Sequence, residues 1–207
     1  IHGKSEKLCY LFVRDGEAEI RVAEHLKRKG VYETSDLIRK EIPERNAKIA
    51  AIGPAGENRV KFACISFELH HQAGRGGTGC VMGSKNLKAI AVRGTNKPQV
   101  HEPESWKEFV KETVRKEIVE NPAMESTKTM GTPYYVYTSN AAGLLPTRNY
   151  QDGVFEHANK IDWDAIKQNV FVRKTACYRC PVACRNITNV RSGPFNGLTI
   201  EGPEYET

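Results

Sequence analysis

The sequence predicts a mixed fold, α/β in the broad sense and α+β in detail, on two observations. The first half alternates short β-rich apolar runs with glycine-containing turns, which is the pattern of strands. The second half opens with apolar residues at helical spacing. The segment from Asn96 to Pro103 holds two prolines and few apolar residues, and it separates the two patterns. We therefore expect two parts, a strand-rich part over residues 1–101 and a mainly helical part over residues 102–207.

The first part is predicted to contain a hairpin, a helix and three further strands. Leu8 to Val13 and Glu17 to Val22 are the two arms of the hairpin, because Arg14-Asp15-Gly16 between them is a turn sequence. Thr34 to Lys40 has apolar residues on one helical face and is followed by Pro43, which ends a helix. The further strands are expected in the apolar runs Lys48 to Ile52, Val60 to Ile65 and Leu87 to Val92, with turns at Gly53 to Asn58.

The second part is predicted to begin with an amphipathic helix. Ser105 to Glu120 carries apolar residues at near-helical spacing and ends before Asn121-Pro122. Trp106 and Phe109 are expected to face a core, because aromatic residues on such a stripe are mostly buried. Beyond this helix we expect loops at Gly131 to Tyr137 and Gly143 to Tyr150, and a short helix at Trp163 to Gln168.

Charge and hydropathy exclude several classes of protein. The net charge is +6, but basic residues alternate with almost as many acidic ones, so the surface is mixed and solvated. Lys27-Arg28-Lys29 is the only compact basic run, and we expect no nucleic-acid partner. No run reaches the roughly 18 apolar residues of a membrane span. We expect a cytoplasmic protein with no membrane association. Because the chain starts at Ile1, we also expect an internal piece of a longer protein.

Three of the six cysteines form a compact array, Cys177-x2-Cys180-x3-Cys184. Closely spaced thiolates favour a metal site over disulfides, and they imply a reducing compartment. An iron-sulfur cluster is the favoured interpretation, zinc the second and uncoordinated thiols the third. Zinc would need a second pair of ligands, and radical enzymes that use S-adenosylmethionine have the reverse spacing. A cluster would need a fourth ligand outside the chain, an open iron, or one of Cys9, Cys64 and Cys80.

A second candidate site is the glycine-rich segment from Gly74 to Lys85. Its glycines let backbone amides approach an anion, and Arg75 and Lys85 can bind phosphate oxygens. The spacing fits neither the P-loop nor the dinucleotide-binding fingerprint. The alternative is a tight turn between two strands with a basic rim. The residues alone leave these two interpretations evenly balanced.

Five motifs, taken together and in this order, resemble the aldehyde:ferredoxin oxidoreductase family. They cover most of the chain, so the resemblance is specific. The motifs are Gly53 to Asn58, Gly74 to Lys88, Gly143 to Asn149, the cysteine array of Cys177, Cys180 and Cys184, and Glu201 to Thr207.

The resemblance implies cofactors and a domain for each part. Enzymes of this family hold a tungsten bis-pterin (tungstopterin, a molybdopterin-type cofactor), or molybdenum in its place, beside a 4Fe-4S cluster. Residues 1–101 would be the C-terminal part of the β-rich pterin-binding base domain. Residues 102–207 would begin the helical domain with the cluster loop.

The resemblance also assigns roles to particular residues. The three array cysteines would be the first three cluster ligands, with the fourth outside this chain. Glu206, in preference to Glu204, would lie near the metal and assist proton transfer. The pterin phosphates, bridged by Mg2+ that a loop carbonyl helps to hold, would lie at Arg75, Gly76, Gly77, Thr78, Gly79 and Lys85.

The implied activity is oxidation of small aldehydes to carboxylic acids, with electrons passed to ferredoxin or another electron-transfer protein in an anaerobic cytoplasm. The remainder of its own chain and a second copy in a homodimer are the other implied partners, and the present chain alone is expected to be inactive. One alternative is a relative of the same fold that acts on aromatic acyl-thioesters, of the benzoyl-CoA reductase type. Another is a non-catalytic iron-sulfur or zinc-binding module.

Overall fold

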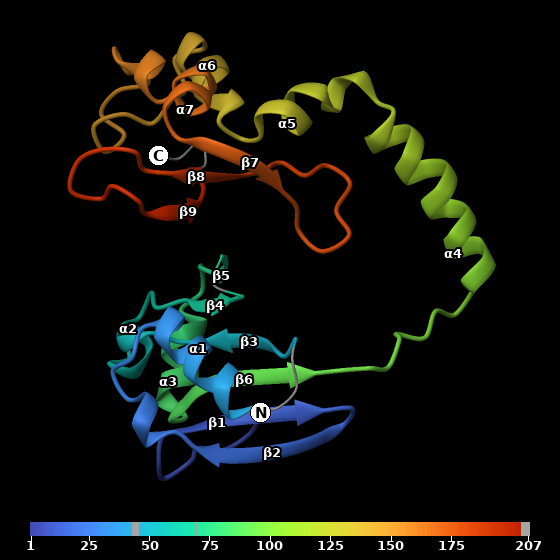
Figure 1. Ribbon diagram of the computed structural model, residues 1–207, viewed down its shortest axis with the longest axis vertical. Coiled ribbons are helices and arrows are strands. Elements are labelled where there is room, and N and C mark those ends of the chain that lie inside the picture. The colour runs from blue at the N-terminus through green and yellow to red at the C-terminus, as the bar shows by residue number, and fades with distance from the viewer. Residues whose placement is uncertain (43–45, 69, 204–207) are drawn as a thin grey trace. The chain divides into compact units, whose positions relative to one another are not determined.

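The computed structural model describes residues 1–42, 46–68 and 70–203 (Figure 1). The chain divides into two compact units, residues 1–99 and 100–207, and each is described by itself. Mixed sheets and helices in both units confirm the predicted α+β class. Among the described helices, none is long and apolar enough to cross a bilayer.

The first unit is built on one six-stranded sheet with the order β2-β1-β6-β3-β4-β5. Only the β1–β6 pair is parallel among the strand pairs of this sheet, and the others are antiparallel. α1 and α3 connect strands that lie apart in the sheet, whereas α2 lies between the neighbouring strands β3 and β4. The elements are β1 (Cys9–Arg14), β2 (Glu17–Val22), a 3-10 turn η1 (Glu24–Leu26), α1 (Val31–Glu41), β3 (Lys48–Ala51), α2 (Pro54–Glu57), β4 (Ile65–Phe67), β5 (His71–Ala73), α3 (Thr78–Ser84) and β6 (Leu87–Arg93).

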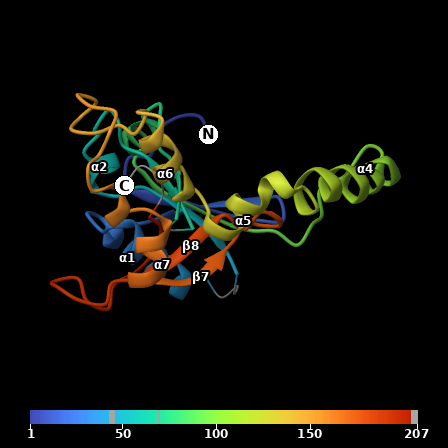
Figure 2. The same ribbon diagram turned by 90° about the horizontal axis from the view of Figure 1, so that it is seen from above.

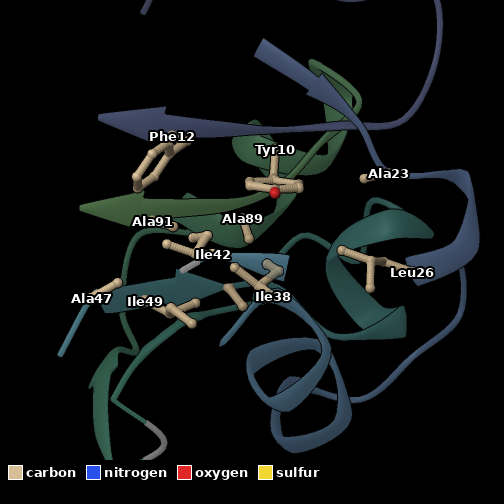
Figure 3. Packing of buried hydrophobic residues seen from close by; sticks show 11 residues of the cluster. Tyr10, Phe12, Ala23, Leu26, Ile38, Ile42, Ala47, Ile49, Ala89 and Ala91 are labelled. Atoms are coloured by element: carbon tan, nitrogen blue, oxygen red, sulfur yellow. The ribbon is translucent and has the colours of Figure 1, made fainter. Parts of the chain in front are cut away.

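The main core lies between α1 and one face of the sheet. Ile38 and Ile42 pack toward Tyr10 of β1 and Ala89 of β6, as Figure 3 shows. The alternation of strand residues places Tyr10 on this face and Cys9 on the other, where a smaller cluster forms with Met82 of α3. α3 is thereby attached to the sheet by its own apolar side chain.

The hairpin and the helix of the first part are confirmed. β1 and β2 pair in the register Arg14↔Glu17 across the two-residue turn Asp15-Gly16. The helix begins three residues earlier than predicted, at Val31, because Gly30 in extended conformation precedes it. Pro43, the predicted terminator, lies outside the described residues.

The strand predicted at Val60 to Ile65 is wrong. The chain turns there, with the Ala63 amide donating to the Val60 carbonyl at 2.9 Å, and β4 begins only at Ile65. The physical reason is a tertiary contact, because the backbone of Lys61 to Cys64 packs against the glycine segment instead of a strand. The turn sequence at Gly53 to Asn58 contains the single helical turn α2, which Pro54 starts as its first residue.

The second unit combines helices with a three-stranded antiparallel sheet in the order β7-β8-β9. Trp163 packs edge-on against Phe171 at 5.3 Å between ring centroids and joins α7 to the sheet. The elements are α4 (Pro103–Phe109), the π-helix η2 (Val110–Val119), η3 (Pro122–Met124), α5 (Glu125–Met130), α6 (Tyr134–Ala141), η4 (Ala158–Lys160), α7 (Trp163–Asn169), β7 (Phe171–Thr175), β8 (Arg185–Asn189) and β9 (Thr199–Glu201).

The helix predicted at Ser105 to Glu120 is observed as α4 followed by η2, but two other predictions for the second part need correction. Trp106 and Phe109 are 53% and 49% exposed, and no residue of α4 or η2 is buried in the described part of the chain. Figures 1 and 2 show these segments as one extended helix, and its apolar stripe is not buried within the described residues of the second unit. The loop predicted at Gly131 to Tyr137 contains the start of α6, because Pro133 fits the entry of a helix. The short helix at Trp163 is confirmed as α7.

Candidate functional site

The glycine segment leads from β5 into α3. Gly76 and Gly77 have φ values of 85° and 65°, which glycine adopts without steric cost. The Thr78 hydroxyl donates to the Ala73 carbonyl at 3.2 Å and closes the turn that enters the helix. Since α3 separates β5 from β6, the segment is not a tight turn between two strands.

Three glycines of the segment are required by close backbone packing. A Cβ atom added at Gly77 would lie 2.1 Å from the carbonyl oxygen of Lys61. A Cβ atom added at Gly79 would lie 2.3 Å from the carbonyl oxygen of Cys64. At Gly83 it would lie 1.9 Å from the carbonyl oxygen of Gly56 in α2. Each distance is far below van der Waals contact, so any side chain would push α3 away from its support.

Gly76 differs from its neighbours, because a Cβ atom there would meet nothing within 4 Å. Gly76 and the adjacent Arg75 are both exposed. An open backbone position beside a guanidinium suits a phosphate, which accepts hydrogen bonds from both kinds of donor. The Lys85 ammonium is engaged elsewhere and donates to the Gly3 carbonyl at 3.0 Å.

The three array cysteines lie in the loop between β7 and β8. The Cys180 amide donates to the Cys177 carbonyl at 3.0 Å, which forms a tight turn, and Arg179 and Ala183 have φ values of 56° and 51°. Within the described residues none of the three cysteines forms a disulfide, and Cys177 is exposed while the other two are half-buried. The loop therefore carries three cysteine side chains within one short stretch.

Residues outside the array hold the ends of this loop. The Arg185 guanidinium donates to the Ala176 carbonyl at 2.9 Å and pairs with Glu201 of β9 at 2.5 Å. The Lys174 ammonium donates to the Cys184 carbonyl at 3.3 Å. Sequence reasoning missed these residues, although basic residues flank the array on both sides.

Gly131 also belongs to the support of the cysteine loop. With φ at 76°, it faces the Cys184 carbonyl so closely that a Cβ atom would lie 2.1 Å from the oxygen. Beside it, the buried Asn186 side chain donates to the Met130 carbonyl at 3.2 Å. No sequence signal identifies Gly131, because the contact joins segments more than fifty residues apart.

Within the described residues, no group of three or more His, Cys, Asp or Glu side chains could hold a single metal ion. A zinc ion requires its donors to meet at one centre, whereas a cube-shaped cluster takes each thiolate on a separate iron. Three cysteines in one loop are compatible in donor chemistry with the cluster.

Glu204 and Glu206 lie outside the described residues. The segment that leads to them is held to β8, where the Thr188 hydroxyl donates to the Gly202 carbonyl at 2.8 Å and the Gly202 amide donates to the Asn186 carbonyl at 2.9 Å. β8 starts directly after Cys184. The sequence that precedes the two carboxylates therefore packs on the strand that the cysteine loop enters.

The sequences of both units match models of one family of oxidoreductases. The family model described as aldehyde ferredoxin oxidoreductase, N-terminal domain, matches residues 1–94. The model described as aldehyde ferredoxin oxidoreductase, domains 2 and 3, matches residues 109–207. The chain belongs to the aldehyde ferredoxin oxidoreductase family.

Curated relatives agree along the whole chain. The tungsten-containing aldehyde ferredoxin oxidoreductases of Thermococcus kodakarensis and Pyrococcus furiosus are 43% and 42% identical to it over 207 residues, which is 100% of this chain and 34% of each relative. The chain thus spans about a third of their length.

A solved structure is also similar, the active site complex BamBC of benzoyl coenzyme A reductase with 1,5-dienoyl-CoA. It matches with a TM-score of 0.74 and 32% identity, over 97% of this chain and 32% of that one.

Proposed function

We propose that the whole protein is a tungsten-pterin, iron-sulfur oxidoreductase that oxidises aldehydes to carboxylic acids and passes the electrons to ferredoxin or another electron-transfer protein. The observation that carries this proposal is the 43% identity to a tungsten-containing aldehyde ferredoxin oxidoreductase along all 207 residues. When bound, the tungsten-pterin centre and the 4Fe-4S cluster supply the redox chemistry. The protein's residues bind and orient these groups.

The first unit is proposed to bind the phosphate end of the pterin. Arg75 would supply a charge-assisted hydrogen bond, and the backbone at Gly76 would approach the phosphate without a side chain in the way. Gly77 and Gly79 would keep the segment packed against the backbone of Lys61 to Cys64. Thr78 would hold the turn closed through its hydrogen bond to the Ala73 carbonyl. A carbonyl of this loop would help to hold Mg2+. Lys85 would join the phosphate contacts by releasing the Gly3 carbonyl, to which its ammonium donates in this structure.

The second unit is proposed to hold the cluster through Cys177, Cys180 and Cys184, with a fourth cysteine from the remainder of the protein. Arg185 and Lys174 support this proposal, because they bind backbone carbonyls at the two ends of the loop and so limit its motion. Glu206, or Glu204 in second place, is proposed to hold and transfer a proton near the metal. An anaerobic cytoplasm suits such a cluster, and a homodimer is the proposed assembly.

A second candidate reaction is the reduction of an aromatic acyl-thioester. The observation that favours it is the likeness to the benzoyl coenzyme A reductase complex, at 32% identity and a TM-score of 0.74. The greater identity to the aldehyde ferredoxin oxidoreductases places the aldehyde reaction first.

The test is elemental analysis of the full-length protein, purified without oxygen, followed by assays with an aldehyde and with an aromatic acyl-thioester. Tungsten together with about four irons per chain, and activity on the aldehyde, is the expected result. Activity on the thioester alone would select the second candidate. Zinc without iron or tungsten would overturn both. As a control, Cys177→Ala should lower the iron content and leave the protein folded.

A further inference from the structure

A buried ion pair lies beside the glycine segment and outside the proposed cofactor contacts. The side chain of Lys88 on β6 is 0% exposed, and it pairs with Glu57 of α2, which is 11% exposed. The Lys88 ammonium also donates to the Lys29 carbonyl at 2.7 Å. The Glu57 carboxylate accepts from the Arg28 amide at 2.9 Å and 3.1 Å. Both charges are therefore satisfied by partners from three different segments.

The presence of a buried ion pair here requires an explanation, because removing two charges from water costs free energy that their attraction only partly returns. An apolar pair of similar size would often be as stable. Lys88 also has no access to a ligand, since its ammonium is buried among protein atoms. Its role is therefore not direct phosphate binding.

The pair fixes the place of α2. This helix has only four residues, and Glu57 is the last of them. A helix of one turn has little stability of its own, so its position depends on the contacts that it makes. Through Glu57, α2 is attached to Lys88 of the central strand β6 and to the Arg28 amide. Lys88 in turn binds the Lys29 carbonyl.

α2 in turn fixes the glycine segment. The Gly56 carbonyl, one residue before Glu57, packs against Gly83 of α3, where a Cβ atom would lie 1.9 Å away. The backbone that follows α2 also carries the segment, because the Gly79 amide donates to the Ala63 carbonyl at 2.9 Å. A shift of α2 would move α3 and the Arg75-Gly76 backbone that precedes it.

We propose that Lys88 and Glu57 are positioning residues that hold α2, and through it the glycine segment, in the arrangement that receives the pterin phosphates. This inference rests on the proposed function. It adds two residues that touch no cofactor and act through Gly56 and Gly83.

The experiment compares the full-length protein with its Glu57→Gln variant, both purified without oxygen, by tungsten and iron content and by hydrogen exchange. Glu57→Gln keeps the size of the side chain and removes its charge. We expect tungsten occupancy to fall on the order of tenfold while iron stays near the wild-type content. Amides of residues 74–79 should exchange faster, and those of β1 should not change.

Two further variants make the result decisive. Lys88→Met combined with Glu57→Leu removes both charges, so no unpaired charge is left buried and the fold is retained. It should still lose tungsten, because the links to the Arg28 amide and the Lys29 carbonyl are gone. Lys48→Met is the matched control, since it breaks the partly solvated pair with Glu68 in the same unit, and it should keep its tungsten.

Wild-type tungsten occupancy and unchanged exchange in both Glu57 variants would overturn the inference. A wild-type protein without tungsten would instead overturn the proposed function, and the exchange of residues 74–79 would still test the positioning role. The two failures are therefore distinguishable.

Discussion

The carbonyl oxygen of Cys184 lies against Gly131, where a Cβ atom would come within 2.1 Å of it. This contact connects the end of the cysteine loop to the turn between α5 and α6. The loop is thus held at one end by a residue that offers no side chain, and at both ends by basic side chains that bind its carbonyls.

Gly131→Ala should displace the cysteine loop. The added methyl group overlaps the Cys184 carbonyl, and φ at 76° adds backbone strain of about 1 kcal/mol or more. We expect the iron content of the anaerobically purified full-length protein to fall severalfold. Gly193→Ala is the control, because Gly193 has the same φ of 76° but open space around it. Equal iron in the two variants would show that the contact is unimportant.

Gly83→Ala should destabilise the first unit by about 1–3 kcal/mol, the usual cost of overpacking a close contact. The methyl group would be 1.9 Å from the Gly56 carbonyl oxygen, so α2 and α3 must separate. Gly94→Ala meets nothing within 4 Å and should change stability by less than about 0.5 kcal/mol. Chemical denaturation of each variant measures the difference in the free energy of unfolding. Hydrogen exchange of the α3 amides in the folded proteins shows whether the change lies at this helix. A Gly83→Ala protein as stable as the Gly94→Ala protein would contradict the packing argument.

Glu201→Gln should destabilise the second unit by about 3 kcal/mol, because it leaves the mostly buried Arg185 guanidinium without its carboxylate. The Arg185 side chain is only 15% exposed and the Glu201 side chain 8%. Glu156→Gln breaks the exposed pair with Arg148 and should have a much smaller effect, because solvent screens exposed charges. Thermal denaturation of the wild-type protein and the two variants provides the comparison. Similar losses of stability in both variants would argue against a special role for the buried pair.

Glu68 predicts a dependence of stability on pH. Burial raises its pKa, but hydrogen bonds from Lys48 and the Ile49 amide outweigh burial and leave the pKa below its ordinary value. A carboxylate with a lowered pKa stabilises the folded state above its unfolded pKa of about 4.3, and this stabilisation is lost as pH falls through the folded pKa.

Glu68→Gln should therefore destabilise the first unit at pH 7, by about 1 kcal/mol or less because the pair is partly solvated. The difference from wild type should shrink as the pH falls below 4. Urea denaturation at several pH values tests this. A difference that stays constant across this range would contradict the assignment.

Local patterns account for the elements that were predicted correctly. Arg14-Asp15-Gly16 between two strand-like runs predicts the hairpin, and the apolar face of Thr34 to Lys40 predicts α1 without its first turn. These signals lie within a few residues of one another. The cysteine spacing is equally local, so the three candidate ligands could be named without a structure, while their role as ligands stays a prediction.

Contacts between distant segments account for the elements that were missed. Lys61 to Cys64 would suit a strand by its residues, but it packs on Gly77 and Gly79 instead. Trp106 and Phe109 have the spacing of core residues, yet within the described chain they are exposed. Burial depends on what packs against a face, and the spacing of residues along one helix does not contain that information.

The sequence by itself determined the family of this protein, the hairpin, the thiol array and the glycine-rich segment, because each is written in neighbouring residues. The tertiary structure alone decided that Lys88 is buried with Glu57, that Gly83 receives the Gly56 carbonyl and that Gly131 receives the Cys184 carbonyl. The physical reason is that the effect of a buried charge, or of a glycine without a side chain, depends on the atoms that pack against it. Those atoms come from distant parts of the chain.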